Sequence, residues 1–477
     1  MSIRLVRVGV VRTELSTRMP FKYGIATMTH LPHVFVELEA AVDGVPARGV
    51  ASDHLPPKWF TKDPERAVAD EVRDMECVIQ KAAHLAEGLE AESVFDLWLE
   101  LHGRMETWRG ENHWPPLLVH FGTSLVERAA IDAWCRAHQT TFGEALRTGK
   151  FGVRLGEIHP ELHGYEPREF LPAQSGTAVS LRHTVGLADP IDALDGGTAI
   201  DDGLPETLME NIAAYGLKHF KVKFTGPHDL PRLDRVFETI AIRAGEGVRF
   251  TLDGNESFRS VAEFAATWTA IEALPAWRGV RAGLICVEQP IHRAIALAEG
   301  PLAELLRWTE RPPLIIDESD AEFDSVRRAL DGGYLGTSHK NCKGVFRGVA
   351  NACLLARRRR NGDGRLLQTG EDLANVGPVA LLQDLAVQAA LGIESVERNG
   401  HHYFRGLSFL PETVQRQVVD FHSDLYRWHP RGFAALAPSG GRIRIGSVTS
   451  APFGLAFIPD LSRPPGHQRP LSRLVLP

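Results

Sequence analysis

Charged residues recur along the second half of the chain at intervals of about one strand plus one helix. The first two, Lys221 and Lys223, lie on one side of a short alternating strand, "HFKVKF", whose other side is apolar. Three acidic residues and a further lysine follow: Asp253, Glu288, Asp317 and Lys340. The successive intervals after Lys223 are 30, 35, 29 and 23 residues, and each is about the length of one β/α unit. Consecutive strands are therefore predicted to deliver these charged groups to one place.

Three carboxylates brought together repel one another, and this predicts a cation among them. Oxygen ligands from Asp and Glu suit Mg²⁺, which keeps positions open for water or substrate. A lysine that lies beside other cations and is partly removed from water has a lowered pKa, so Lys223 and Lys340 are candidate bases. Each residue also has a purely structural interpretation: Asp317 can cap the following helix, and a lysine on a strand can extend its ammonium group into solvent.

The elements that carry these groups are eight short apolar segments between residues 178 and 398, most of them separated by amphipathic, helix-length stretches. Eight strand–helix units are the number in a closed parallel (β/α)8-type TIM barrel, in which catalytic groups gather at the C-terminal ends of the strands. An open doubly wound sheet is the competing topology, but no glycine-rich phosphate loop follows any of these segments. We therefore predict an α/β fold with the barrel at residues 178–410.

The rest of the chain divides into three parts. Residues 1–150 begin with alternating strands, two of them joined at the turn Asp43-Gly44, and continue with amphipathic helices, which predicts a separate α+β domain. Residues 151–177 contain three prolines and no clear period, so we expect a connector there. Residues 411–477 follow the last barrel unit, and we expect them to pack back on the N-terminal domain or on the barrel.

The composition argues against several classes of protein. A chain of 477 residues with 44% hydrophobic and 24% charged residues is typical of a soluble globular protein, and a net charge of −7 argues against a nucleic-acid partner. The run Arg357–Arg360 is interpreted as the last turn of a helix. No two of the five cysteines have CxxC spacing, and no apolar run is long enough to span a membrane. We expect a cytoplasmic protein without membrane contact.

Five short motifs in order make the chain resemble the enolase superfamily, and within it the muconate-lactonizing-enzyme-like subgroup of the mandelate racemase/muconate lactonizing enzyme family. The motifs are "KVK" (221–223), "LDGN" (252–255), "VEQP" (287–290), "IDES" (316–319) and "HKNCK" (339–343). The resemblance covers about residues 178–400, and "MPFKYG" (19–24) is similar to the loop that closes over the substrate. It implies a (β/α)8-type TIM barrel with an N-terminal α+β capping domain.

The resemblance also implies a role for each charged residue. The residues that correspond to the Mg²⁺ ligands are Asp253, Glu288 and Asp317. Lys223 and Lys340 correspond to the acid/base pair that exchanges a proton α to a carboxylate, and Lys221 to the group that stabilises the enolate. The residues expected to contact the substrate are Asn255, Glu318, His401, His402, Lys22 and Tyr23.

On this resemblance we expect an isomerase, either a racemase/epimerase or a cycloisomerase, that acts on a small carboxylate and forms a homo-oligomer. Two alternatives stay open: an acid-sugar or related dehydratase on the same scaffold, and an inactive barrel that only binds ligand. Mandelate-racemase-like members use a histidine late in the barrel, and "LLQTGED" on the seventh strand has none, which favours the two-lysine arrangement. A metal-dependent amidohydrolase should show HxH on the first strand, where "SLRHTVG" has only His183.

Overall fold

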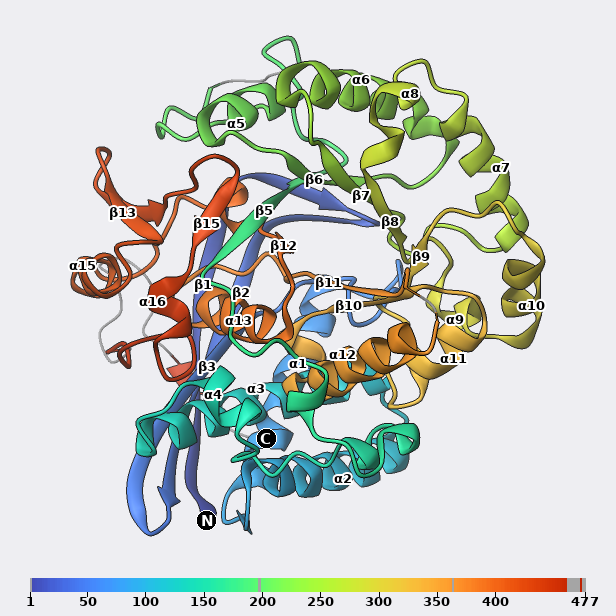
Figure 1. The fold of residues 1–477 in the computed structure, drawn as a ribbon. Helices are drawn as coiled ribbons and strands as arrows, with labels where there is room; N and C mark the ends of the chain where they lie inside the picture. Colours follow the sequence, from blue (N-terminus) through green and yellow to red (C-terminus); the bar gives the residue numbers. More distant parts are fainter. Residues whose placement is uncertain (1, 196–198, 363, 461–471, 474–477) are drawn as a thin grey trace.

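Within the residues that this computed structural model describes (2–195, 199–362, 364–460 and 472–473), eight parallel strands form a closed barrel (Figure 1). In order they are β5 (Ala178–Val185), β6 (His219–Lys223), β7 (Arg249–Asp253), β8 (Leu284–Glu288), β9 (Leu314–Ile315), β10 (Gly336–His339), β11 (Leu367–Gly370) and β12 (Ser395–Glu397). Neighbours along the chain pair with each other, β12 pairs with β5, and a parallel bridge between Ile316 and Thr337 closes the gap between β9 and β10. The predicted barrel is confirmed.

Helices surround the barrel (Figure 1). They are α5 (Leu208–Tyr215), α6 (Leu230–Thr239), α7 (Val261–Glu272), α8 (Trp277–Val280), α9 (Arg293–Ala296), α10 (Glu299–Arg307), α11 (Ser325–Asp331), α12 (Val345–Arg360), α13 (Val379–Leu391) and α14 (Gly400–Tyr403). In β6, Phe220 and Val222 join the hydrophobic core, whereas Lys221 and Lys223, on the opposite face, line a cavity at the mouth of the barrel. The alternation in the sequence thus places the core residues on one face of β6 and the charged residues on the other.

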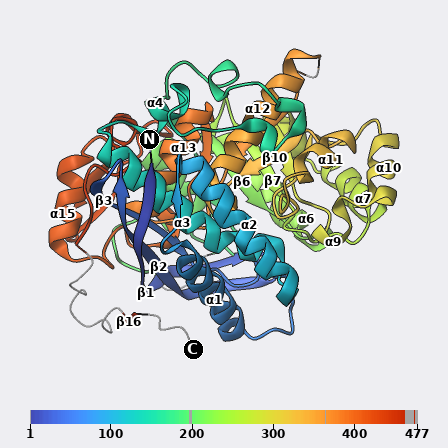
Figure 2. The same cartoon turned by 90° about the horizontal axis from the view of Figure 1, so that it is seen from below.

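The N-terminal domain is an antiparallel sheet packed against helices (Figure 2). Its elements are β1 (Ile3–Tyr23), β2 (Ala26–Val42), β3 (Val45–His54), α1 (Val68–Ala86), β4 (Glu90–Ala91), α2 (Val94–Asn112), α3 (Pro116–Ala137) and α4 (Phe142–Arg147). At the predicted turn between β2 and β3, Asp43 and Gly44 have φ angles of 49° and 81°, as a two-residue hairpin turn requires. α3 packs closely on β3 at Gly49. A Cβ atom added there would lie 2.0 Å from the backbone oxygen of Ala129, so only glycine allows this approach.

The far end of the β1–β2 hairpin meets the C-terminal ends of the barrel strands. There the Phe21 ring stacks on Tyr403 of α14, with 4.1 Å between the ring centroids. The backbone oxygen of Lys22 accepts a hydrogen bond of 3.1 Å from the N–H of Leu187, which follows β5. The N-terminal domain therefore covers part of the barrel mouth.

The connector and the C-terminal segment join the two domains. Residues 151–177 form short 3₁₀ turns, and Arg358 of α12 lies 3.0 Å from Glu161 in this connector. The C-terminal elements are α15 (Glu412–Phe421), β13 (Tyr426–His429), β14 (Phe433–Leu436), β15 (Arg442–Arg444), α16 (Gly446–Thr449) and β16 (Ser472–Arg473). β15 pairs with β5, and Arg136 of α3 donates a 2.8 Å hydrogen bond to the backbone oxygen of Leu455. The remainder of the predicted C-terminal segment, 461–471 and 474–477, lies outside the described residues.

Three further expectations concern the exterior of the chain. The arginine run 357–360 forms the last turn of α12, as predicted. A search of the described helices finds none with the length and apolarity that crossing a membrane requires. The predicted homo-oligomer stays a prediction, because the structure contains one chain.

Candidate active site

Lys221 lies at the mouth of the barrel among four carboxylates. Its Nζ atom is 2.7 Å from Glu371, 2.8 Å from Glu288, 3.0 Å from Asp253 and 3.1 Å from Glu397, each measured to a carboxylate oxygen. The residue is only 1% exposed. Burial lowers the pKa of Lys221, but the four carboxylates outweigh burial and raise that pKa well above its ordinary value. Lys221 therefore stays charged and holds the acidic cluster together.

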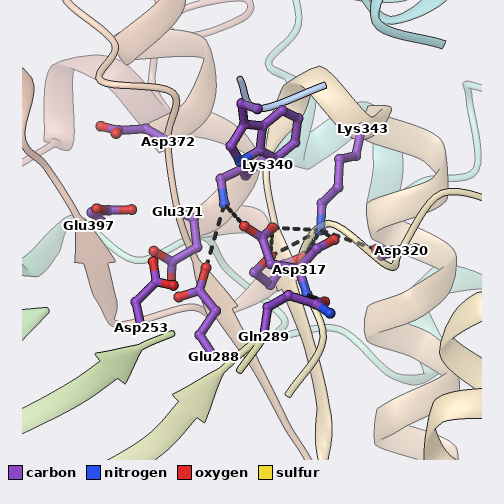
Figure 3. A network of polar contacts seen from close by, with 12 residues as sticks. Asp253, Glu288, Gln289, Asp317, Asp320, Lys340, Lys343, Glu371, Asp372 and Glu397 are labelled. Atoms are coloured by element: carbon purple, nitrogen blue, oxygen red, sulfur yellow. Dashed lines mark hydrogen bonds and ion pairs between the residues drawn. The ribbon is translucent and has the colours of Figure 1, made fainter. Parts of the chain in front are cut away.

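The other two predicted catalytic lysines come from strands that lie across the barrel from each other, β6 and β10. Lys223 Nζ is 2.6 Å from Asp253, and Lys340 Nζ pairs with Asp317 and lies 3.6 Å from Glu288 (Figure 3). The expectation of a lowered lysine pKa is wrong for Lys340 in this structure. Burial does lower the pKa, but Asp317 and Glu288 outweigh burial and raise it above its ordinary value, because carboxylates rather than lysines are its nearest charged neighbours.

Among the described carboxylates of this cluster, Glu288 is the one whose two oxygens both lack a hydrogen-bond donor. It is buried, and neither of its oxygens accepts a hydrogen bond of suitable geometry from the described residues, although Lys221 Nζ lies 2.8 Å away. Burial and the neighbouring Glu371 raise the pKa of Glu288 well above its ordinary value. Together with Asp253 and Asp317 it offers the oxygen-only ligand set that Mg²⁺ prefers, so the residues fit this ion. Binding a cation would exchange the present lysine ion pairs for metal–oxygen contacts.

A second group of potential ligands lies in the N-terminal domain. Within the described ranges, the ligand atoms of His102, Glu106 and His120 all lie within 4.8 Å of one another, which is not so for the barrel carboxylates. The rings of His102 and His120 are stacked, with 3.9 Å between centroids and 2° between planes, so their in-plane lone pairs do not converge on one point. Glu106 is already paired with Arg109 at 2.8 Å. We interpret these contacts as the packing of α2 on α3.

The predicted metal ligands are oriented by neighbouring groups. Asp253 accepts a 2.9 Å hydrogen bond from the backbone N–H of Asn255. The side-chain oxygen of Gln289 accepts a 2.8 Å hydrogen bond from the backbone N–H of Asp317, and Lys343 Nζ lies 3.3 Å from the Asp317 carboxylate (Figure 3). The residues next to these ligands in the sequence motifs therefore hold the ligand carboxylates in place.

Two members of the acidic cluster, Glu371 and Glu397, are not among the residues predicted from the sequence. Glu371 follows β11 and pairs with Arg182, and Glu397 ends β12 and accepts a 2.6 Å hydrogen bond from the Thr184 hydroxyl. Burial raises the pKa of Glu371, but Arg182 and Lys221 outweigh it and hold that pKa well below its ordinary value. Burial raises the pKa of Glu397 to about 7. In parallel barrels catalytic groups lie at the C-terminal ends of the strands. This rule identified Asp253, and applied to β11 and β12 it would also have identified Glu371 and Glu397.

A cavity opens among these groups. One side of it is charged and comes from the barrel. The other side, which we call the apolar wall, consists of Phe21, Tyr23, Met28, Pro56, Trp59, Leu373 and Ala374. Two of the predicted substrate contacts line the cavity, namely Asn255 and Tyr23. The Tyr23 hydroxyl donates a 2.8 Å hydrogen bond to the backbone oxygen of Pro57, so this residue presents its ring to the cavity.

The other four predicted substrate contacts are not among the described residues that line this cavity. The side chain of Lys22 is exposed, and Glu318 is buried beside a separate cavity between the two domains. The rings of His401 and His402 are buried and both pack against His183. The geometry therefore gives no support to substrate contact by these four residues.

Comparisons with known proteins agree with this architecture. No protein-family model matches the chain, and no curated protein matches it by sequence. Among solved structures, a muconate lactonizing enzyme from Pseudomonas fluorescens in complex with muconolactone is similar over 92% of this chain and 94% of its own, with 16% identity and a TM-score of 0.56. An enolase from Pseudomonas fluorescens Pf0-1 with bound magnesium, potassium and tartrate is similar over 93% and 88%, with 14% identity and a TM-score of 0.58.

A third similar structure is an N-succinyl Arg/Lys racemase from Bacillus cereus ATCC 14579. The similarity covers 93% of this chain and 97% of the racemase, with 15% identity and a TM-score of 0.53. At this identity the likeness concerns the fold. The chain therefore has the two-domain fold of the mandelate racemase and muconate lactonizing enzymes of the enolase superfamily, which is the fold that its five motifs predict.

Proposed function

We propose that this protein is a Mg²⁺-dependent isomerase that exchanges the proton α to the carboxylate of a small molecule, a racemase or epimerase first and a cycloisomerase second. The observation that carries the proposal is that Lys223 and Lys340 come from opposite strands of the barrel and line one cavity, beside three carboxylates. The bound magnesium of the Pf0-1 enolase and the activity named for the Bacillus cereus racemase support it, because both proteins share this fold.

The proposed Mg²⁺ ligands are Asp253, Glu288 and Asp317. Bound there, the ion would withdraw electron density from the substrate carboxylate and make the α-proton more acidic. The chain itself supplies the orientation of this site. The backbone N–H of Asn255 and the side chain of Gln289 hold two of the ligands in place, as described above.

The two lysines exchange the proton. A base must lie within about 2.6–3.2 Å of the proton that it takes, and a substrate held between β6 and β10 presents opposite faces of its α-carbon to Lys223 and Lys340. In the metal-loaded site, where Asp253, Glu288 and Asp317 would no longer pair with the lysines, the Nζ of one lysine would be free to lose its proton and to take the α-proton. The charged Nζ of the other lysine returns a proton to the opposite face. Lys221 stays protonated among its carboxylates and offsets the negative charge that develops when the proton leaves.

The proposal is tested by exchange of the α-proton in deuterated water, followed by proton NMR on a panel of small carboxylates. We expect exchange that needs Mg²⁺ and that stops on exhaustive chelation. Glu288→Gln should abolish exchange while leaving the circular dichroism spectrum unchanged, because it removes one anionic ligand and keeps the shape of the side chain. Exchange that survives chelation would show that the metal assignment is wrong.

A further inference from the structure

The segment that carries Lys340 is short and stiff. Lys340 follows β10, and a 3₁₀ turn, Asn341–Lys343, leads from it to Gly344 and the start of α12. Two backbone hydrogen bonds of 3.0 Å close this turn, and their acceptors are the oxygens of Lys340 and Asn341. A group that fixes the start of α12 therefore also fixes the backbone of Lys340.

The N-terminus of α12 has no cap of its own. The residue before its first turn is Gly344, which has no side chain and a φ angle of 110°, in the region that favours glycine. The first N–H groups of a helix have no partner within the helix, and a side chain at this position usually accepts from one of them. At α12 the acceptor has to come from another part of the chain.

Glu127 of α3, in the N-terminal domain, supplies this acceptor. One of its carboxylate oxygens accepts a 3.0 Å hydrogen bond from the N–H of Val345, and the other accepts a 2.8 Å hydrogen bond from the N–H of Phe346. Glu127 is 1% exposed, and burial raises its pKa to about 7. A buried carboxylate is costly unless its oxygens are paired, and a helix N-terminus stabilises a negative charge. Both conditions are met at this contact between the two domains.

The other side of the segment is held by the barrel. Lys343 Nζ lies 3.3 Å from the carboxylate of Asp320, and Arg347, in the first turn of α12, lies 3.4 Å from the same carboxylate. Asp320 belongs to the loop after β9. The segment 340–347 is therefore held between this loop on one side and Glu127 on the other.

We propose that Glu127 is a positioning residue for Lys340, through which the N-terminal domain holds one of the two lysines in place. The inference rests on the proposed function, in which Lys340 serves one face of the α-carbon. Lys223 lies on β6, between β5 and β7, and no described hydrogen bond or ion pair joins its side chain to the N-terminal domain. Loss of the Glu127 carboxylate should therefore impair one face of the substrate and spare the other.

The test is Glu127→Gln, which keeps the size of the side chain. An amide has one acceptor oxygen and carries N–H donors in place of the other oxygen, so one backbone N–H of α12 loses its partner. The readout is α-proton exchange in deuterated water by the magnesium-loaded protein, with each enantiomer of mandelate and of N-acetylalanine. Lys340→Ala identifies the enantiomer that Lys340 serves. We expect Glu127→Gln to slow exchange of this enantiomer by about 10²-fold, the cost of a misplacement of about 1 Å, and to leave the other unchanged.

Equal slowing of both enantiomers in Glu127→Gln, or of neither, would overturn the inference. Asp132→Asn is the matched control. Asp132 lies on the same helix and is buried, but it accepts its 3.0 Å hydrogen bond from the N–H of Val50, within the N-terminal domain. We expect Asp132→Asn to slow neither enantiomer selectively. A selective loss in this variant as well would show that any disturbance of α3 has this effect, and the assignment to Glu127 would fall.

Val345→Pro reports on the same contact if Glu127→Gln does not fold. Proline has no N–H and suits the first position of a helix, and the ψ angle of 134° at Gly344 lies in the range that precedes proline. The change removes one of the two donors to Glu127. We expect exchange of the same enantiomer to slow by about 10-fold, the value of one hydrogen bond to a charged group. Unchanged exchange would contradict the role of Glu127.

Amide hydrogen exchange of the substrate-free protein, followed by mass spectrometry, tests the contact without catalysis. We expect the amides of residues 341–348 to exchange at least about 10-fold faster in Glu127→Gln, and the amides around Lys223 to be unaffected. Unchanged protection of residues 341–348 would overturn the inference. Faster amide exchange there, in a protein that exchanges the α-proton of neither mandelate nor N-acetylalanine nor any other carboxylate of the panel, would refute the proposed function only.

Discussion

His54 connects the N-terminal domain to the loop that carries part of the apolar wall. It ends β3, is fully buried, and its Nε2 atom lies 3.1 Å from the backbone oxygen of Ala374. Its ring stacks on Phe404, with 5.3 Å between centroids. Burial lowers the pKa of His54 to about 3. The folded protein therefore holds this imidazole in its neutral form, and His54 should contribute to the pH dependence of the free energy of unfolding.

The sign and size of the effect follow from linkage. In the unfolded chain a histidine titrates near about pH 6.5, so below that pH the unfolded state takes up a proton that the folded state refuses. The stability contributed by the neutral ring is complete above about pH 6.5 and is lost as the pH falls toward the folded pKa. Each pH unit costs about 1.4 kcal/mol. Between pH 6.5, where half of the unfolded chains already carry this proton, and pH 4.5 the loss is about 2.3 kcal/mol.

Urea unfolding of the protein with and without His54→Gln, at several pH values between 8 and 4.5, isolates this residue. Glutamine keeps a side-chain N–H donor for Ala374 but does not titrate. Buried histidines away from His54 titrate in both proteins and cancel in the difference between the two unfolding free energies. The neighbouring His33, whose Nδ1 atom lies 3.0 Å from that of His54, is replaced by glutamine in both proteins so that it does not contribute. We expect that difference to shrink by about 2.3 kcal/mol between pH 6.5 and 4.5. A difference that stays constant over this range would refute the assignment of a buried, neutral His54.

Three further predictions concern the barrel and its metal. Arg398→Met should destabilise the protein by about 3–5 kcal/mol in urea unfolding, because it leaves Asp372 (2.9 Å away) and Asp384 (3.7 Å) buried without a cation; a loss under about 1 kcal/mol would contradict this. Gly336→Ala should cost about 1–3 kcal/mol or more, since its Cβ would lie 1.8 Å from a backbone oxygen of β11, and an unchanged unfolding midpoint would contradict this packing. Mg²⁺ at 100 times its dissociation constant should add about 2.7 kcal/mol of stability, and Glu288→Gln should remove this gain; equal gains in both proteins would place the ion elsewhere.

The barrel could be predicted because each of its strands can be recognised from a short stretch of sequence. Each strand is a short apolar segment at a regular interval, and in a closed barrel the position at a strand end alone brings Lys223, Asp253 and Asp317 to one mouth. The same rule applied to the last two strands would have included Glu371 and Glu397. Neither residue belongs to the five motifs that carry the family resemblance, the last of which is "HKNCK" at the sixth strand.

Other features depend on contacts between distant parts of the chain and could not be predicted. The pKa of Lys340 is raised because Asp317 and Glu288 are its neighbours in space, and their distances are set by the assembled barrel. His401 follows the last strand closely, yet its ring packs inward against His183 rather than into the cavity. The apolar wall joins segments that are more than 300 residues apart, from Phe21 to Leu373.

In the proposed mechanism Lys223 and Lys340 serve opposite faces of one α-carbon, and stereospecific proton exchange measures whether they do. Lys223→Ala and Lys340→Ala would each be incubated with Mg²⁺ and, separately, with each enantiomer of a substrate in deuterated water, and α-proton exchange followed by NMR. We predict that each variant loses exchange of one enantiomer and keeps exchange of the other, with opposite outcomes for the two variants. Loss of exchange of both enantiomers in both variants would contradict the two-base account and show that the lysines act as one electrostatic unit.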